Sequence, residues 1–153
     1  MSETWDRAMN RASQAQIAEH LRRCDADFIP PLTDRIEFDG YAYKLASKAE
    51  RFEAWADDAL VGLVAVYCND VERRTAFITS VSVLRGWQGR RIASQLLEQA
   101  IAHAIALSFD HLELEVDRRN AHAIALYEKT NFIAGPVHGQ SMTMHLDTLR
   151  KQP

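Results

Sequence analysis

Residues 81–93 read VSVLRGWQGRRIA and lead from a hydrophobic strand into the start of a long helix. Two glycines and three arginines lie in this connection. The first turn of a helix has backbone N–H groups without partners inside the helix, and the helix dipole adds about half a positive charge there. Phosphate groups bind readily at such a place, and Arg90 and Arg91 would add charge. The residues alone therefore predict either a site for a phosphate-bearing ligand or an ordinary helix start.

The segment matches neither of two common phosphate-binding loops. It lacks the GxxxxGK[ST] pattern of P-loop nucleotide hydrolases and the GxGxxG pattern of dinucleotide folds. The six histidines show no ligand spacing such as HxxH or HExxH, so we expect no metal site. Ser80 and Ser141 lie in no nucleophile elbow, and no Ser-His-Asp order can be argued.

On the amino-terminal side, three predicted strands precede the segment. They occupy residues 51–57, 59–68 and 74–84, and the Asp57-Asp58 pair predicts a hairpin turn between the first two. The second strand has a nearly continuous apolar core, which is typical of a strand covered on both faces. Before them we expect a short strand and two helices, at residues 5–9, 14–24 and 41–49, with Ser13 and Asp39 as the helix N-caps.

On the carboxyl-terminal side, the apolar pattern changes from helix to strand. A helix at residues 92–106 carries a broad apolar stripe. Residues 111–117 alternate, with Leu112, Leu114 and Val116 on one side and Glu113, Glu115 and Asp117 on the other, which predicts a strand. A helix at 121–130 and two short strands at 132–134 and 141–146 follow. The sum is a mixed α/β (α+β) domain whose central sheet is covered by helices.

The composition is that of an ordinary globular protein with a single domain, residues 1–153. Hydrophobic residues make up 47% and the net charge is -3, without the basic excess of nucleic-acid-binding proteins. The longest apolar stretch, Ala59 to Val66, is far shorter than the roughly 20 residues of a membrane helix, and the start resembles no signal peptide. Cys24 and Cys68 form no CxxC pair, so a zinc-ribbon or thioredoxin-like motif is absent, and we expect free thiols rather than a disulfide. Since the start resembles no signal peptide, we expect a cytoplasmic protein, and the charge and hydropathy predict no nucleic-acid or membrane partner.

Two further patterns, in a fixed order, carry a family resemblance. The first consists of Val81-Ser82-Val83, Gln88-Gly89-Arg90-Arg91-Ile92-Ala93 and Leu96-Leu97. The second consists of Asn120, Ala123, Leu126-Tyr127-Glu128-Lys129 and Asn131-Phe132. They resemble the acetyl-CoA signature Q/R-x-x-G-x-G/A and the motif N-x-x-A-x-x-L-Y-E-K-x-G-F of the GNAT N-acetyltransferase superfamily. The resemblance covers residues 75–133 well and the first 50 residues only loosely.

The resemblance implies a fold and an activity. The fold would be a GNAT-like mixed, mostly antiparallel sheet of six to seven strands covered by about four helices, with a splay between the fourth and fifth strands. The activity would be transfer of an acetyl group from acetyl-CoA to a primary amine by direct attack, with a small-molecule amine as the favoured acceptor. Acetylation of a protein N-terminus or lysine is one alternative, and a non-catalytic acyl-CoA-binding regulatory module is another. The family also allows a homodimer joined through the C-terminal strands.

The resemblance also assigns roles to individual residues. Backbone groups of Val81 and Val83 would bind the pantetheine arm, and the side-chain amide of Asn120 would bind it as well. Tyr127 would protonate the leaving CoA thiolate, unless it is merely a core aromatic residue; a phenol with a pKa near 10 suits that transfer. Glu115, twelve positions before Tyr127, would serve as base through water, unless it lies on a solvated strand face. Backbone amides would hold the pyrophosphate along the loop of Gln88, Gly89, Arg90, Arg91, Ile92, Ala93 and Ser94.

Two positions depart from the family motifs. Arg91 stands where the family has its first glycine, and we expect it to keep a helical conformation and place its guanidinium on a phosphate. The alternative is a distorted loop with weak cofactor affinity. Asn131 stands where the family has glycine before Phe132, and asparagine tolerates the left-handed conformation better than most residues.

The segment at residues 25–44 is rich in acidic residues, which could influence which amine acceptor binds. An acidic entrance would attract a cationic amine, but the same acids are also typical of solvated helix ends and turns. The acids are Asp25, Asp27, Asp34, Glu37 and Asp39.

Overall fold

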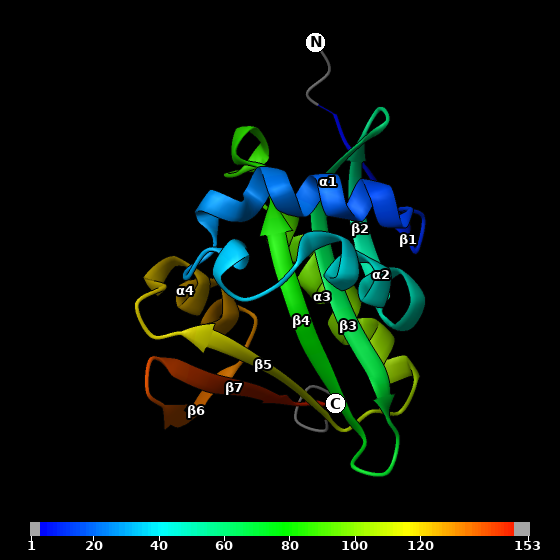
Figure 1. Ribbon diagram of the computed structural model, residues 1–153. Helices are drawn as coiled ribbons and strands as arrows, with labels where there is room; N and C mark the ends of the chain where they lie inside the picture. Colours follow the sequence, from blue (N-terminus) through cyan, green and yellow to red (C-terminus); the bar gives the residue numbers. More distant parts are fainter. Residues whose placement is uncertain (1–3, 149–153) are drawn as a thin grey trace.

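A computed structural model describes residues 4–148, which form a seven-stranded sheet with helices on both faces (Figure 1). The strand order is β1-β2-β3-β4-β5-β7-β6, and every neighbouring pair is antiparallel except β4 and β5. The predicted fold class is confirmed. The elements are β1 (Asp6–Met9), α1 (Gln14–Cys24), α2 (Phe38–Lys48), β2 (Glu50–Ala56), β3 (Ala59–Asp70), β4 (Thr75–Val83), α3 (Ile92–Ala106), β5 (His111–Asp117), α4 (Ala121–Lys129), β6 (Ile133–His138) and β7 (Ser141–Asp147).

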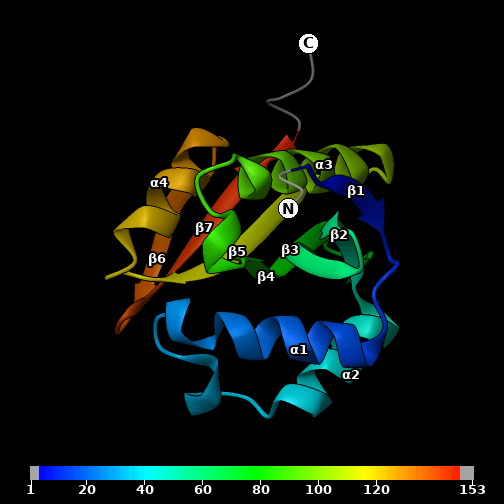
Figure 2. The same cartoon turned by 90° about the horizontal axis from the view of Figure 1, so that it is seen from above.

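The helices divide the hydrophobic core into two parts. Figure 2 shows α1 and α2 on one side of the sheet and α3 and α4 on the other. Leu63 and Ala65 of β3 pack with α1 and α2, whereas Val64 and Val66 pack with α3. The apolar core of β3 is therefore buried on both faces, as its nearly continuous run predicted.

Side chains of the expected type cap the first two helices, but one cap was misassigned. Ser13 and Gln16 form a capping box at the start of α1, which confirms the prediction of Ser13 as its N-cap. The prediction of Asp39 as the second cap is wrong. Glu37 caps α2, because its carboxylate accepts from the backbone N–H groups of Asp39 at 2.7 Å and Gly40 at 2.8 Å, so α2 begins at Phe38.

An irregularity in β4 separates it from β5. Ser80 pairs with Ala65 and Ile78 with Val66, so Thr79 is an extra residue in β4, a β-bulge. On the opposite edge, the pairing of β4 with β5 ends at Ile78 and Leu114. The two strands diverge beyond this point, as Figure 1 shows, which confirms the predicted splay.

The hydroxyl of Tyr41, on α2, holds the bulge. It donates to the carbonyl oxygen of Thr79 at 3.0 Å and lies 2.7 Å from Thr79 Oγ1. Thr79 has no cross-strand partner in the pairing of β4 with β3 or β5, so Tyr41 supplies a contact that the sheet does not.

We expect Tyr41→Phe to lower the free energy of unfolding by about 1 kcal/mol, since it removes a partly buried hydrogen bond. Urea denaturation measures this. Tyr43 lies on the same helix and is 60% exposed, so Tyr43→Phe is the matched control and should stay within about 0.5 kcal/mol of the parent. Equal stability of the two variants would contradict the role of Tyr41.

Candidate active site

A cleft of about 1620 Å³ opens where β4 and β5 separate. It is bordered by the second half of β4, the following loop, the first turn of α3, the end of β5, and α4. A segment between α1 and α2 closes part of it from the other side of the sheet. The cleft brings together the predicted site residues Val81, Val83, Gln88, Gly89, Arg91, Ile92, Ala93, Ser94, Glu115, Asn120 and Tyr127.

Arg90 is the predicted site residue that does not line the cleft. Its guanidinium carbon lies 4.5 Å from the centroid of the Trp87 ring, a cation–π contact within the loop. This placement differs from that of Arg91, which lines the cleft. The two arginines of the loop therefore have different surroundings.

The start of α3 differs from the starts of the other α-helices. Side chains of Ser13, Glu37 and Asn120 accept hydrogen bonds from first-turn N–H groups of α1, α2 and α4. Arg91 holds the N-cap position of α3, and no side chain caps that helix. Its first-turn N–H groups therefore lack the acceptor that the other three helices have, which is the arrangement that binds anions.

Arg91 adopts the left-handed conformation, with φ 64° and ψ 21°. The expectation that it would keep a helical conformation is wrong, because Arg91 takes a backbone shape that glycine adopts without steric cost. Gly89 also has a positive φ, of 82°, so the chain turns twice before α3 begins. Asn131 has a φ of 75°, which confirms that asparagine occupies the left-handed region at the second departure from the motif.

Gln88 and Asn120 each commit one side-chain atom to local structure. Gln88 Nε2 donates to the carbonyl oxygen of Val83 at 3.1 Å, which fastens the loop to the end of β4. Asn120 Oδ1 accepts from Ala123 N at 3.1 Å, so the side-chain oxygen caps α4. The Asn120 amide nitrogen is not used in that cap and can donate into the cleft.

Tyr127 is both a core residue and a cleft residue. It is 8% exposed, and its ring meets Phe132 edge-on with centroids 6.2 Å apart. Burial raises the pKa of Tyr127 to about 12, so the hydroxyl stays protonated through the neutral range. The ordinary phenol pKa assumed from sequence is therefore too low for this position.

Glu115 has different surroundings from Glu113 and Asp117, the other acids of β5. Asp117 is bound by Arg119 through two contacts, at 2.9 and 2.8 Å, and the hydrogen bonds from Arg119 lower the pKa of Asp117 to about 2. Glu113 does not line the cleft. Glu115 is exposed, lines the cleft, and makes no ion pair within residues 4–148. Its carboxylate is therefore free to interact with a ligand or water.

The acids of residues 25–44 hold local structure, and most of them do not face the cleft. Asp27 pairs with Arg85 at 2.6 Å and Asp39 with Arg22 at 3.0 Å. Asp25 accepts from the backbone of Thr33, and Glu37 caps α2. Of the charged residues in this segment, Asp27 and Arg35 line the cleft. The interpretation as helix ends and turns is therefore the better one.

Sequence reasoning missed a contact between Ser82 and His20, which lie 62 positions apart. No spacing rule connects residues on a helix and a strand that only the fold brings together. Within residues 4–148, no helix has both the length and the apolar content needed to cross a membrane. The same residues contain no group of three or more His, Cys, Asp or Glu side chains that could hold a metal ion.

Comparison with known proteins gives a consistent family match. Residues 15–132 match the model of the acetyltransferase (GNAT) family. The chain is 32% identical over 98 residues to a mycothiol acetyltransferase of Beutenbergia cavernae; the match covers 58% of this chain and 33% of that protein. The chain thus spans about a third of the length of that relative.

Solved structures share the fold. The PaiA N-acetyltransferase of Thermoplasma acidophilum, in complex with coenzyme A, superposes with a TM-score of 0.72 at 14% identity, over 93% of this chain and 99% of that one. The ribosomal-protein-S18-alanine N-acetyltransferase of Escherichia coli superposes with a TM-score of 0.74 at 18% identity, over 94% of each chain.

We expect Arg91→Gly to be more stable than Arg91→Ala by about 1 kcal/mol, because only glycine adopts the left-handed conformation without a steric cost. Urea denaturation of the two variants measures the difference. Arg90 is the control, since it has no positive φ, and there the glycine variant should be no more stable than the alanine variant. If the glycine variant were more stable than the alanine variant at Arg90 as well as at Arg91, the left-handed assignment of Arg91 would be contradicted.

Proposed function

The chain belongs to the acetyltransferase (GNAT) family, and from this premise we propose that it transfers an acetyl group from acetyl-CoA to the primary amine of a small molecule. The observation that supports the proposal best is the uncapped start of α3, which opens into the same cleft as Tyr127. An anion site and a buried proton donor in one cleft suit a substrate with a diphosphate at one end and a thioester at the other.

The chain's own residues would bind the cofactor at three places. First-turn N–H groups of α3, with the Arg91 guanidinium beside them, would hold the pyrophosphate. The edge of β4 at Val81 and Val83 has no β5 partner and would bind the pantetheine amides as a strand would. The Asn120 amide nitrogen would donate to the same arm. Acetyl-CoA supplies the activated acyl group when it is bound.

Two side chains would manage the protons of the reaction. Glu115 would accept the proton of the attacking ammonium group through water. Tyr127 would donate its hydroxyl proton to the departing sulfur. Since burial holds the pKa of Tyr127 near 12, this donation is uphill to a free thiolate and must accompany cleavage of the carbon–sulfur bond.

A second acceptor class is supported by the position of Glu115. It resembles the glutamate of family members that acetylate protein N-termini, and the S18-alanine N-acetyltransferase shares the fold. An exposed carboxylate at the cleft suits a peptide ammonium as well as a small amine. A non-catalytic binding module is less well supported, because Tyr127 and Asn120 both line the cleft.

The proposal is tested first by calorimetric titration with acetyl-CoA, then by thiol release over a panel of amines. The panel contains a polyamine, an amino acid, an amino sugar and a peptide with a free N-terminus. Faster thiol release with any small amine supports the proposal. Release with the peptide alone supports the protein acceptor, and binding without release to any amine supports the regulatory module.

Replacing Tyr127 with phenylalanine should lower kcat by roughly 10- to 1000-fold, which is the scale of one lost acid–base group. The affinity for CoA should change little, because the ring and its contact with Phe132 remain. Steady-state thiol release and calorimetry measure the two quantities, with Tyr43→Phe as the control. An unchanged kcat in Tyr127→Phe would remove the hydroxyl from its role.

The pH profile should show no alkaline loss of kcat up to about pH 10. Tyr127 donates only in its protonated form, and a pKa raised to about 12 keeps that form dominant well above the ordinary phenol range. Initial rates between pH 6 and about pH 10 measure this. An alkaline limb near pH 9 that disappears in Tyr127→Phe would show that the hydroxyl titrates normally.

A further inference from the structure

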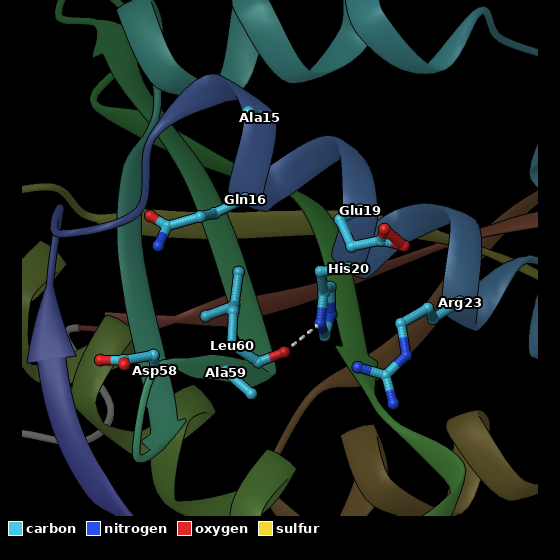
Figure 3. Close-up of a pocket in the computed structure, with 8 residues that line it drawn as sticks. All are labelled: Ala15, Gln16, Glu19, His20, Arg23, Asp58, Ala59 and Leu60. Atoms are coloured by element: carbon cyan, nitrogen blue, oxygen red, sulfur yellow. Dashed lines mark hydrogen bonds between the residues drawn. The ribbon is translucent and has the colours of Figure 1, made fainter.

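His20, on α1, lies between the cleft and a smaller surface pocket. It is 2% exposed and lines the smaller pocket, which has a volume of about 320 Å³. Figure 3 shows its ring directed from α1 toward the carbonyl oxygen of Leu60, with Glu19 and Arg23 on the same helix beside it. Its other ring nitrogen faces Ser82, which lines the cleft. His20 therefore reaches the cleft only through Ser82 and its neighbours.

The hydrogen bonds of His20 define its tautomer. Nδ1 lies 2.8 Å from the carbonyl oxygen of Leu60, and a carbonyl oxygen only accepts, so Nδ1 carries the proton. Burial lowers the pKa of His20 to about 4, so the ring is neutral at neutral pH. Nε2 is then an acceptor, and the Ser82 hydroxyl, 2.8 Å away, donates to it.

This arrangement has the three parts of an activated nucleophile. Ser82 Oγ is the hydroxyl, His20 Nε2 is the base, and the Leu60 carbonyl orients the ring. Cys24 Sγ lies 3.7 Å from the same Nε2, but burial raises the pKa of the Cys24 thiol to about 12. Both groups are protonated, and the shorter contact of Ser82 Oγ with Nε2 favours Ser82 as the nucleophile.

Ser82 also lies beside the proposed path of the acyl donor. It lies between Val81 and Val83, whose backbone groups are the proposed contacts of the pantetheine arm, and all three line the cleft. The geometry points to Ser82 as a second acyl acceptor: in the absence of an amine, it takes the acetyl group of acetyl-CoA and then releases it to water. This inference rests on the proposed function for its acyl donor, acetyl-CoA.

The step balances without a further reactant. Ser82 Oγ attacks the thioester carbonyl carbon and its proton passes to His20 Nε2. The carbon–sulfur bond breaks, and the sulfur leaves with that proton as the CoA thiol, which leaves an acetyl ester on Ser82. Water then attacks the ester, Nε2 accepts one water proton and returns it to Ser82 Oγ, and acetic acid is released and gives its proton to the solvent.

The reaction should be slower than transfer to an amine. The ring is oriented by a neutral carbonyl, so no carboxylate stabilises the imidazolium that forms. Burial, which lowers the pKa of His20 to about 4, also makes Nε2 a weak base. A neutral amine attacks a thioester without needing His20. Acetylation of Ser82 is therefore expected when acetyl-CoA is bound and no amine acceptor is present.

The test incubates the full chain with acetyl-CoA alone and follows thiol release, together with intact mass and peptide mapping. The parent should release thiol and gain one acetyl group on Ser82. In Ser82→Ala, the rate of thiol release without an amine should be at least 10-fold lower. Ser80→Ala is the matched control, because Ser80 lies on the same strand and lines the same cleft but its hydroxyl has no partner within residues 4–148. Equal rates for the parent and Ser82→Ala, or an acetyl group mapped to Cys24, would overturn the inference.

A second arm separates this inference from the proposed function. p-Nitrophenyl acetate replaces acetyl-CoA, so acylation of Ser82 no longer depends on cofactor binding. His20→Gln keeps a hydrogen-bond acceptor but no base, and it should slow acylation by at least 10-fold while the chain stays folded. If acetyl-CoA does not bind but p-nitrophenyl acetate labels Ser82, the proposed function fails and the nucleophile stands. Amine transfer with no label on Ser82 and no loss of the amine-free rate in Ser82→Ala, from either donor, leaves the function standing and overturns the inference.

Discussion

One extra residue in β4 controls the geometry of the cleft. Thr79 is the extra residue in the pairing of β4 with β3, and the pairing of β4 with β5 ends one residue before it, at Ile78. A bulge bends and twists its strand, which turns β4 away from β5 at this point. The backbone from there to Val83 keeps its β3 partner on one side and opens to the cleft on the other. A strand edge without a β5 partner is thus left open to the cleft.

The proposed anion site depends on the absence of a side-chain cap at the start of α3. Serine, glutamate and asparagine oxygens satisfy the first turns of α1, α2 and α4. Arginine has no acceptor atom, so Arg91 cannot cap the helix as those residues do. It also keeps a left-handed backbone, so the chain turns at this residue before α3 begins. A charged side chain at this position therefore adds positive potential and leaves the backbone donors open, at the cost of a strained residue.

The parts of the fold that were predictable are those set by local patterns. The alternation at residues 111–117 gave β5 its exact bounds, and Ser13 located the start of α1, because both signals lie within a few residues. The cap of α2 was misassigned because Glu37 and Asp39 are both plausible acceptors, and only the helix position distinguishes them. The backbone of Arg91 was misjudged because arginine seldom adopts φ above zero. The contact of His20 with Ser82 could not be predicted, since it is created by packing α1 against the sheet.

Burial, rather than charge, tunes the acid–base groups on the two faces of the sheet. Desolvation penalises the charged form of any group, so it keeps Tyr127 protonated and His20 neutral. Tyr127 comes from the face covered by α3 and α4 and can only donate, whereas His20 comes from the α1 face and accepts through Nε2. The helices α1 and α4 pack on opposite faces of the sheet (Figure 2), and Tyr127 lines the cleft directly, whereas His20 reaches it only through Ser82. Glu115, the third proposed acid–base group, is exposed and lines the cleft, so it meets solvent where Tyr127 and His20 are buried.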